Sequence, residues 1–295
     1  MKKIIAVFFI AAALVYSCAP LERTNPTDPQ SPSYIGYHFI REIGDFSSLS
    51  DFCITGSSLY AVDISDKRIY KYNFDGINEY YLENPLPPLS LPSGITLAGA
   101  GLYVIDSDPS EPELTWLDKD NPGSYTEIDI SKGGNKITSD SQYLYIAKSD
   151  PPFVYKYDEA TVITNLVPAS YWPLTKSSET GGVMYISDIE YMPEYDRVLI
   201  ADSGADRISV FTTDGVFEKH IVPGGQVIGI AAQGGTIYAP DETGIHFINF
   251  SGGKINKTIG DYGEGSGRIT EPGLIEVSGD NIFYSGGDTI KYFAP

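Results

Sequence analysis

The chain has 295 residues, 42% of them hydrophobic, and a formal net charge of −19 at pH 7. This acidity excludes nucleic acid as an expected partner and argues against electrostatic binding to anionic lipid, because both are polyanions. Proteins, glycans and cations remain as candidate partners. The 22 Tyr, 13 Phe, 30 Gly and 20 Pro residues are typical of many short strands joined by tight turns.

Residues 1–17 form a predicted export signal. Two lysines precede an apolar run over residues 4–15, which is too short to span a bilayer. The sequence VYSC at residues 15–18 resembles the lipobox of bacterial lipoproteins. That resemblance implies that the peptide before Cys18 is removed and that Cys18 is acylated. An ordinary signal peptide cut near Ser17 is the alternative.

A lipid anchor at Cys18 predicts a place in the cell envelope, with the protein attached to a membrane and not threaded through it. In the best-known sorting rule of this class, Asp after the cysteine retains the protein in the inner membrane. Ala19 therefore indicates the outer membrane, on its periplasmic or surface side. Residues 18–33 contain the anchor and a Pro-rich tether, and we expect one folded domain over residues 34–295.

A short apolar phrase, mostly closed by an acid or a turn residue, returns six times in this domain. Its second residues lie 43, 42, 54, 39 and 45 positions apart. A strand-like repeat with a period near forty predicts an all-β, six-bladed β-propeller of four-stranded blades. The phrases are LYAVD (59–63), LYVID (102–106), LYIAK (144–148), VLIAD (198–202), IYAPD (237–241) and IFYSG (282–286).

The two ends of the chain predict how the ring closes. The last repeat stops at Pro295 with three strands, whereas residues 36–43 form a strand that no earlier strand precedes. We expect residues 36–43 to pair with Thr289–Phe293 and to complete the sixth blade, which removes an open sheet edge.

Residues 259–293 resemble an NHL-repeat unit, with a Gly-rich turn, a Pro-Gly pair and an apolar pair. The acidic loop before Arg-Ile in that family is matched by ADSGADRISVF (201–211) and more loosely by VDISDKRIYKY (62–72). The resemblance implies a six-bladed propeller. It implies no particular activity, because such propellers include enzymes and plain binding modules.

Four of the repeated phrases end in an acid: Asp63, Asp106, Asp202 and Asp241. Two of these acids precede an arginine by five residues, which across a short loop brings carboxylate and guanidinium together. An acid that recurs at the same position in several blades indicates a structural role in the blade. We therefore expect these acids to fix loops and not to form an active site.

Charged residues near the starts of innermost strands are the candidates for a site at the channel mouth. These are Asp51, Lys136 and Asp188, whereas the other blades have Gly94, Gly229 and Gly273 there. Propeller lactonases take metal ligands from this region, and Asp51 and Asp188 could hold Ca²⁺ or Mg²⁺. Lys136 would oppose such a cation, so no metal or other cofactor is predicted.

Two insertions are expected on the same face, at residues 107–113 and 168–182. Within the second, Tyr171 and Trp172 could stack on a sugar or an apolar ligand. Packing beneath their own loop is the alternative.

The histidines and the second cysteine are assigned to structural positions. His38 and His220 fall on outermost strands and His246 on a third strand, which argues against an axial histidine of the kind found in propeller lyases. Cys53 falls on an innermost strand and is expected to be an inert buried thiol.

The sequence thus predicts a lipid-anchored, non-catalytic envelope propeller that binds a protein or glycan through its insertion-bearing face, with no catalytic residue assigned. The alternative is a metal-dependent hydrolase of the lactonase type, centred on Asp51 and Asp188.

Overall fold

The computed structural model describes residues 36–82, 89–119, 124–130, 132–140, 142–164, 167–260, 267–269 and 271–295. The predicted export signal, Cys18 and the tether lie outside these ranges. In the part of the chain that is described, no helix has the length and apolar character needed to cross a membrane.

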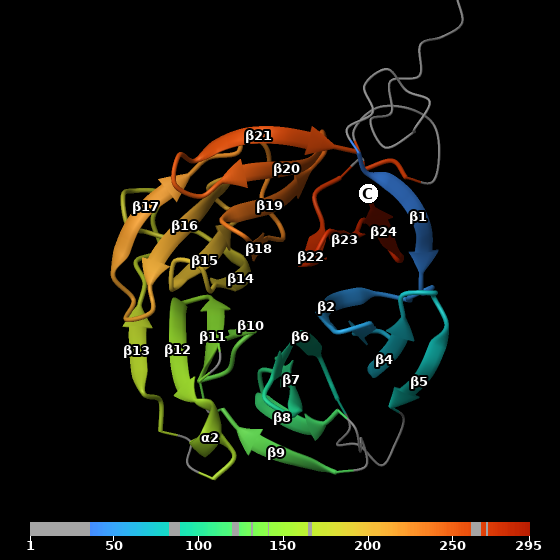
Figure 1. The fold of residues 1–295 in the computed structure, drawn as a ribbon. Coiled ribbons are helices and arrows are strands. Elements are labelled where there is room, and N and C mark those ends of the chain that lie inside the picture. Colours follow the sequence, from blue (N-terminus) through green and yellow to red (C-terminus); the bar gives the residue numbers. More distant parts are fainter. Residues whose placement is uncertain are drawn as a thin grey trace, which may run out of the picture.

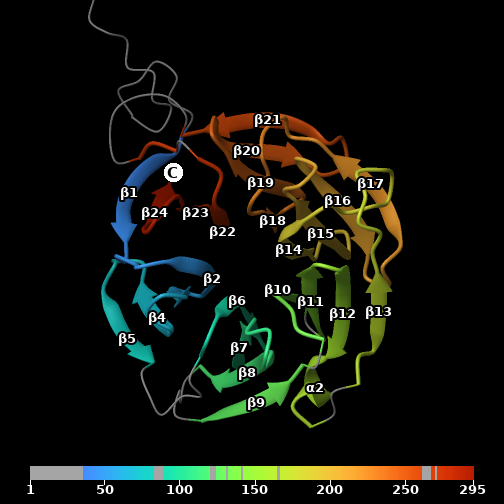
Figure 2. The same cartoon turned by 180° about the vertical axis from the view of Figure 1, so that it is seen from behind.

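Six four-stranded antiparallel sheets form a ring around a central axis, which confirms the predicted six-bladed β-propeller (Figure 1). Seen from behind, the innermost strands of the blades surround the same centre (Figure 2). The strands of blades one to three are β2 (Leu49–Thr55), β3 (Ser58–Asp63), β4 (Arg68–Asn73), β5 (Asn78–Leu82), β6 (Pro92–Ala98), β7 (Gly101–Asp106), β8 (Glu113–Asp118), β9 (Tyr125–Asp129), β10 (Lys136–Ser139), β11 (Tyr143–Ser149), β12 (Pro152–Asp158) and β13 (Ser170–Pro173).

Blades four to six follow the same order along the chain. Their strands are β14 (Ile186–Met192), β15 (Arg197–Asp202), β16 (Arg207–Thr212), β17 (Phe217–Ile221), β18 (Ala231–Gln233), β19 (Thr236–Asp241), β20 (Gly244–Asn249), β21 (Lys254–Ile259), β22 (Leu274–Ser278), β23 (Asn281–Ser285), β24 (Ile290–Ala294) and β1 (His38–Ile43). A short helix, α2 (Glu159–Val162), interrupts blade three between β12 and β13.

The ring closes through the first strand, as predicted. β1 pairs antiparallel with β24, from His38 opposite Ala294 to Ile43 opposite Ile290, with a register shift between Phe39 and Arg41. The sixth sheet therefore contains both ends of the domain, in the order β1-β24-β23-β22.

The core consists of layers between the blades and not of a single central cluster. The second strands are buried on both faces, because a neighbouring blade covers each side. Six hydrophobic clusters of the described residues fill the six interfaces between successive blades. The predicted buried thiol, Cys53, lies on β2 in the cluster between blades one and two, and burial raises its pKa well above the usual value.

The up-and-down order places two kinds of connection on one side of the disc. These are the loops that enter each innermost strand, such as residues 44–48, and the loops that join second to third strands, such as residues 64–67. We name this side the loop face.

The closing strand gives the first testable prediction. Ile43 is fully buried in the cluster between blades six and one. Ile43→Ala should lower the free energy of unfolding by about 2–4 kcal/mol through the lost burial and the cavity left behind. Urea unfolding measures this, and Ile77→Ala, at a residue that is 60% exposed, is the control expected to change it by less than about 0.5 kcal/mol. Equal effects of the two substitutions would contradict the closing role of β1.

Candidate functional site

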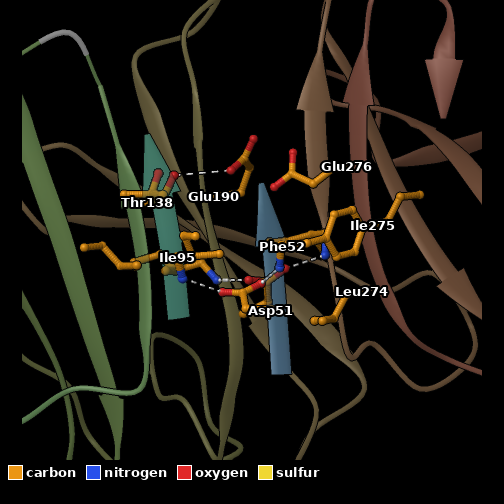
Figure 3. A pocket seen from close by; sticks show the side chains of 13 residues that line it. Asp51, Phe52, Ile95, Thr138, Glu190, Leu274, Ile275 and Glu276 are labelled. Atoms are coloured by element: carbon orange, nitrogen blue, oxygen red, sulfur yellow. Dashed lines mark hydrogen bonds between the residues drawn. The ribbon is translucent and has the colours of Figure 1, made fainter. Parts of the chain in front are cut away.

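Two predicted carboxylates, Asp51 on β2 and Asp188 on β14, lie on the innermost strands of opposite blades. Asp51 accepts a hydrogen bond from the next N–H of its own strand at 3.0 Å and one from Ile95 of blade two at 3.1 Å (Figure 3). Asp188 makes the same pair of contacts, at 2.9 Å within its strand and 2.9 Å to Ile230 of blade five. In each carboxylate, one oxygen accepts a hydrogen bond within its own strand and the other accepts one from the next blade, so the side chain links the two blades.

Lys136, the first residue of β10, lies beside Asp51. Its Nζ is 3.7 Å from Asp51 Oδ2 and donates a hydrogen bond to the carbonyl of Ser50 at 3.2 Å. The Lys136 and Asp51 charges also act in opposite directions on the pKa of Asp188. The structure therefore brings the three predicted residues into one electrostatic group, in which the lysine compensates the acids.

Asp51 and Asp188 border a small space on the axis, which we name the axial chamber. The innermost strands line it, and its acids are Asp51, Asp188, Glu190 and Glu276. Its volume is about 30 Å³, which is room for roughly one water molecule. Thr138 donates a hydrogen bond to Glu190 Oε2 at 3.2 Å inside it (Figure 3). The chamber is too small for an organic substrate.

The sequence-level prediction missed Glu190 and Glu276. Glu190 could have been found, since residues two apart in a strand share a side, and Asp188 and Glu190 are two apart. For blade six the predicted axial residue was Gly273, but Leu274 and Glu276 line the chamber instead. At Gly273 a Cβ would lie 1.8 Å from the carbonyl oxygen of Ser285, so backbone packing requires the glycine there.

Burial raises the pKa of all four acids in the axial chamber. It raises the pKa of Asp188 to about 7 and, together with the Asp188 charge, that of Glu190 to about 8. The pKa of Glu276 lies well above its usual value because of burial and the Glu190 charge. The pKa of Asp51 is raised by burial although Lys136 opposes the shift. At neutral pH, bound protons and Lys136 relieve the repulsion among these acids.

No group of three or more His, Cys, Asp or Glu side chains is arranged to hold a metal ion in the described ranges. The axial acids are close enough to shift one another's pKa, yet they are not arranged as a metal-binding group. The expectation that the protein needs no metal stays a prediction.

The acids that end the second strands fix the loop face, as predicted. Asp63 accepts hydrogen bonds from the N–H groups of Ser47 and Ser48 in the entering loop, at 2.6 and 3.0 Å. Its other oxygen accepts from the N–H groups of residues 65 and 66 in the following loop, both at 2.9 Å. Asp106 binds the N–H groups of residues 90, 91 and 108 in the same manner. We name Asp63, Asp106 and Asp202 the strand-end carboxylates.

Asp202 extends this scheme to the long insertion. Its Oδ1 accepts hydrogen bonds from the N–H groups of Met184 and Tyr185, both at 3.0 Å, and its Oδ2 binds Arg207 Nε at 3.0 Å. Arg207 in turn donates hydrogen bonds to the carbonyls of residues 177, 178 and 182. The fully buried Asp202 thus holds the insertion in place through one arginine.

In blade five, His246 replaces the arginine. Asp241 contacts His246 Nε2 at 2.7 Å, and His246 Nδ1 lies 2.9 Å from Thr258 Oγ1. All three histidines of the chain lie where they were predicted, on β1, β17 and β20, and away from the axis.

The assignment of Tyr171 and Trp172 to the ligand face is wrong. Both residues lie on β13, the outermost strand of blade three. Trp172 is 4% exposed and packs against Tyr145 in the core between blades three and four, whereas the Tyr171 ring lies tilted against Tyr155 with 4.9 Å between ring centroids. α2 and its connections lie between β12 and β13, so the fourth strand of this blade begins later in the sequence than the repeat predicts.

A larger cavity opens on the loop face, where blades two, three and four meet. Its volume is about 360 Å³, within the range of small-molecule sites. The predicted insertion at residues 107–113 forms one wall, residues 132–135 and 148–150 form another, and Tyr185 borders it. The second insertion reaches it through Lys176, whose Nζ is 3.2 Å from Asp150. We name it the loop-face cavity, and sequence analysis predicted its face and one of its walls but not the cavity itself.

Comparisons with known proteins give the fold and no family. No protein-family description and no curated protein matches the sequence. A streptogramin B lyase structure superposes with a TM-score of 0.62 at 11% identity, covering 89% of this chain and 99% of the lyase. A protein of unknown function from Bacteroides thetaiotaomicron superposes with a TM-score of 0.62 at 13% identity, covering 88% of this chain and 75% of that one.

A catalytically inactive variant of virginiamycin B lyase from Staphylococcus aureus, solved with quinupristin, is also similar. Its TM-score is 0.57 at 17% identity, over 84% of this chain and 80% of the lyase. At these identities the similarity shows the propeller fold alone, which agrees with the observed six blades.

The raised pKa values in the axial chamber predict a pH dependence of stability. An acid with a folded-state pKa above its unfolded value contributes stability at low pH, and that stability is lost as pH rises through the folded pKa. With the pKa of Asp188 raised from 3.8 to about 7 and that of Glu190 from 4.5 to about 8, the free energy of unfolding should fall between about pH 4 and 8. Glu190→Gln should flatten this fall in urea unfolding across the pH series. If the free energy of unfolding of the variant falls with pH as steeply as that of the wild type, Glu190 is not the group responsible for the fall.

The Asp202 contacts predict a cost when the carboxylate is removed. Asp202→Ala leaves Arg207 buried without its partner and two N–H groups without an acceptor. We expect the free energy of unfolding to fall by about 2–4 kcal/mol in urea titrations. Asp214→Ala, in an exposed turn of the same blade, should change it by less than about 0.5 kcal/mol. A loss below 1 kcal/mol for Asp202→Ala would show that the insertion is held by other contacts.

Proposed function

We propose that the protein is a lipid-anchored β-propeller of the bacterial cell envelope that binds a protein or glycan through its loop face without catalysing a reaction. The observation that carries this proposal is the loop-face cavity of about 360 Å³, which the insertion at residues 107–113 helps to form and which the second insertion reaches through the ion pair of Lys176 with Asp150. Ligand sites gather on the loops of a rigid scaffold, and the repeat supplies that scaffold here.

A binding role is favoured over catalysis by how the charged groups are used. Asp51 and Asp188 have both oxygens bonded to backbone N–H groups, and Lys136 stands beside Asp51. The lactonase-type alternative needs these same acids as metal ligands, so the geometry gives it less support. An activity of the lyase type has little support from the histidines, which lie on outer strands.

The envelope location rests on the lipobox-like residues 15–18, and the outer membrane on Ala19. The NHL-like pattern of residues 259–293 supports a relation to that repeat family. The strong negative charge of the chain supports a partner that is neutral or cationic and argues against nucleic acid.

The anchor is tested by fractionating cells that express the wild type and Cys18→Ala. Loss of the acylated cysteine should move the protein from the membrane pellet to the soluble envelope fraction, because the acyl chains supply the membrane affinity. Mass spectrometry of the mature wild type should show an acylated N-terminal cysteine. Equal membrane association of the two proteins would refute the anchor.

The binding role is tested with the mature protein in detergent micelles, against soluble glycan and protein fractions of the bacterial envelope. Biolayer interferometry should show saturable binding to one fraction, weakened at least about tenfold by Tyr185→Ala at the cavity. Tyr171→Ala is the matched control, since Tyr171 is 49% exposed and Tyr185 is 51% exposed. Binding that responds equally to both substitutions, or no saturable binding, would overturn the proposal.

A further inference from the structure

The loop-face cavity has a lining that restricts the chemistry of its ligand. One side is formed by the loop from Ser107 to Pro112 and the other by the loop from Lys132 to Asn135. At Gly133 a Cβ would lie 3.4 Å from Pro112 and 3.5 Å from Lys148 Nζ. Gly133 also has φ +68°, a conformation that favours glycine. A Cβ would make only ordinary van der Waals contacts here, so the backbone conformation and not a lack of space accounts for this glycine.

Asn135 supplies an acceptor that the protein does not satisfy. Its Oδ1 is buried and has no hydrogen-bond partner among the described residues, although its backbone N–H bonds to the carbonyl of Ala147 at 2.8 Å. A buried polar atom without a partner costs free energy, so its presence needs an explanation. Asn135 borders the cavity, so a rotation of its side chain would bring Oδ1 to a hydroxyl or amide donor of a bound ligand.

The charged groups of the cavity balance one another. Lys132 and Lys148 face Asp108 and Asp150 around the same space. Lys148 is held in place, since its Nζ donates to the carbonyl of Lys132 at 3.0 Å. In a chain of net charge −19, a locally neutral site does not select for a cation. It offers donors and acceptors to a neutral polar molecule instead.

Tyr185 adds an aromatic surface on an ordered backbone. It is 51% exposed, while its N–H bonds to Asp202 and its carbonyl accepts from Ser203 at 3.1 Å. A strand-end carboxylate thus positions the backbone that presents this ring. Aromatic rings with one polar end bind ligands that combine apolar faces with hydrogen-bonding groups.

We infer that the loop-face cavity is a binding site for a neutral saccharide; this rests on the proposed function and names its ligand class. A pyranose has an apolar C–H face, which lies against the Tyr185 ring. It also has several hydroxyl groups, one of which donates to Asn135 Oδ1 while others meet Asp108, Asp150 and Lys148. A volume of about 360 Å³ accommodates one or two sugar rings.

The test is isothermal titration of the mature protein in detergent micelles with four neutral disaccharides: maltose, cellobiose, lactose and N,N′-diacetylchitobiose. At least one should bind saturably, and Tyr185→Ala should weaken that binding at least about tenfold, with Tyr171→Ala unchanged. Asn135→Leu should weaken binding similarly while leaving the melting temperature equal or higher, because it removes a buried acceptor without a partner. A residue with a merely structural role would lower the melting temperature instead.

Three outcomes would overturn the inference. The first is no binding of any of the four sugars up to about 20 mM, and the second is binding that is insensitive to Tyr185→Ala and Asn135→Leu. In the third, an envelope protein binds in a Tyr185-dependent way and the sugars do not, which refutes the saccharide and leaves the proposed function standing. If neither sugars nor envelope fractions bind, the proposed function fails as well.

Discussion

A buried carboxylate at the end of the second strand, bonded to the N–H groups of the loop that enters the blade, organises the loop face. An ionised group in the interior is costly unless hydrogen bonds compensate for the lost water. Asp63, Asp106 and Asp202 obtain that compensation from backbone N–H groups that would otherwise lack acceptors. One side chain therefore terminates a strand and fixes two loops. Repetition of this contact lets a ring of short strands present ordered loops.

The same contact connects the fold to the proposed site. Asp106 binds the N–H of Asp108, which lines the loop-face cavity, and Asp202 binds the N–H of Tyr185 on its opposite side. Through Arg207, Asp202 also fixes the insertion that reaches Asp150. The cavity is thus held by the carboxylate contact that recurs in blades one, two and four, while the residues that give it chemical character lie in the loops. The axial chamber differs, since its acids join neighbouring blades and enclose space for about one water molecule.

How far the sequence predicts this structure depends on which residues repeat. The closing strand could be predicted because the last repeat has only three strands and the first strand of the domain belongs to no repeat. β1 pairs with β24 accordingly. The role of Asp202 could be predicted because its spacing from Arg207 recurs. Tyr171 and Trp172 could not be placed, since the insertion around α2 obscures where the fourth strand of blade three begins. The unsatisfied Asn135 could not be foreseen, because a missing partner is a property of packing and leaves no sequence pattern.

The central claim is that the strand-end carboxylates hold the loops that form the site, and local hydrogen exchange tests it most directly. In Asp202→Asn, the amides of Met184 and Tyr185 should exchange faster than in the wild type, because their acceptor is weakened. The amides of β1 and β7 should keep their protection, since the ring remains closed. A uniform increase over all blades, or unchanged exchange at Met184 and Tyr185, would contradict the account.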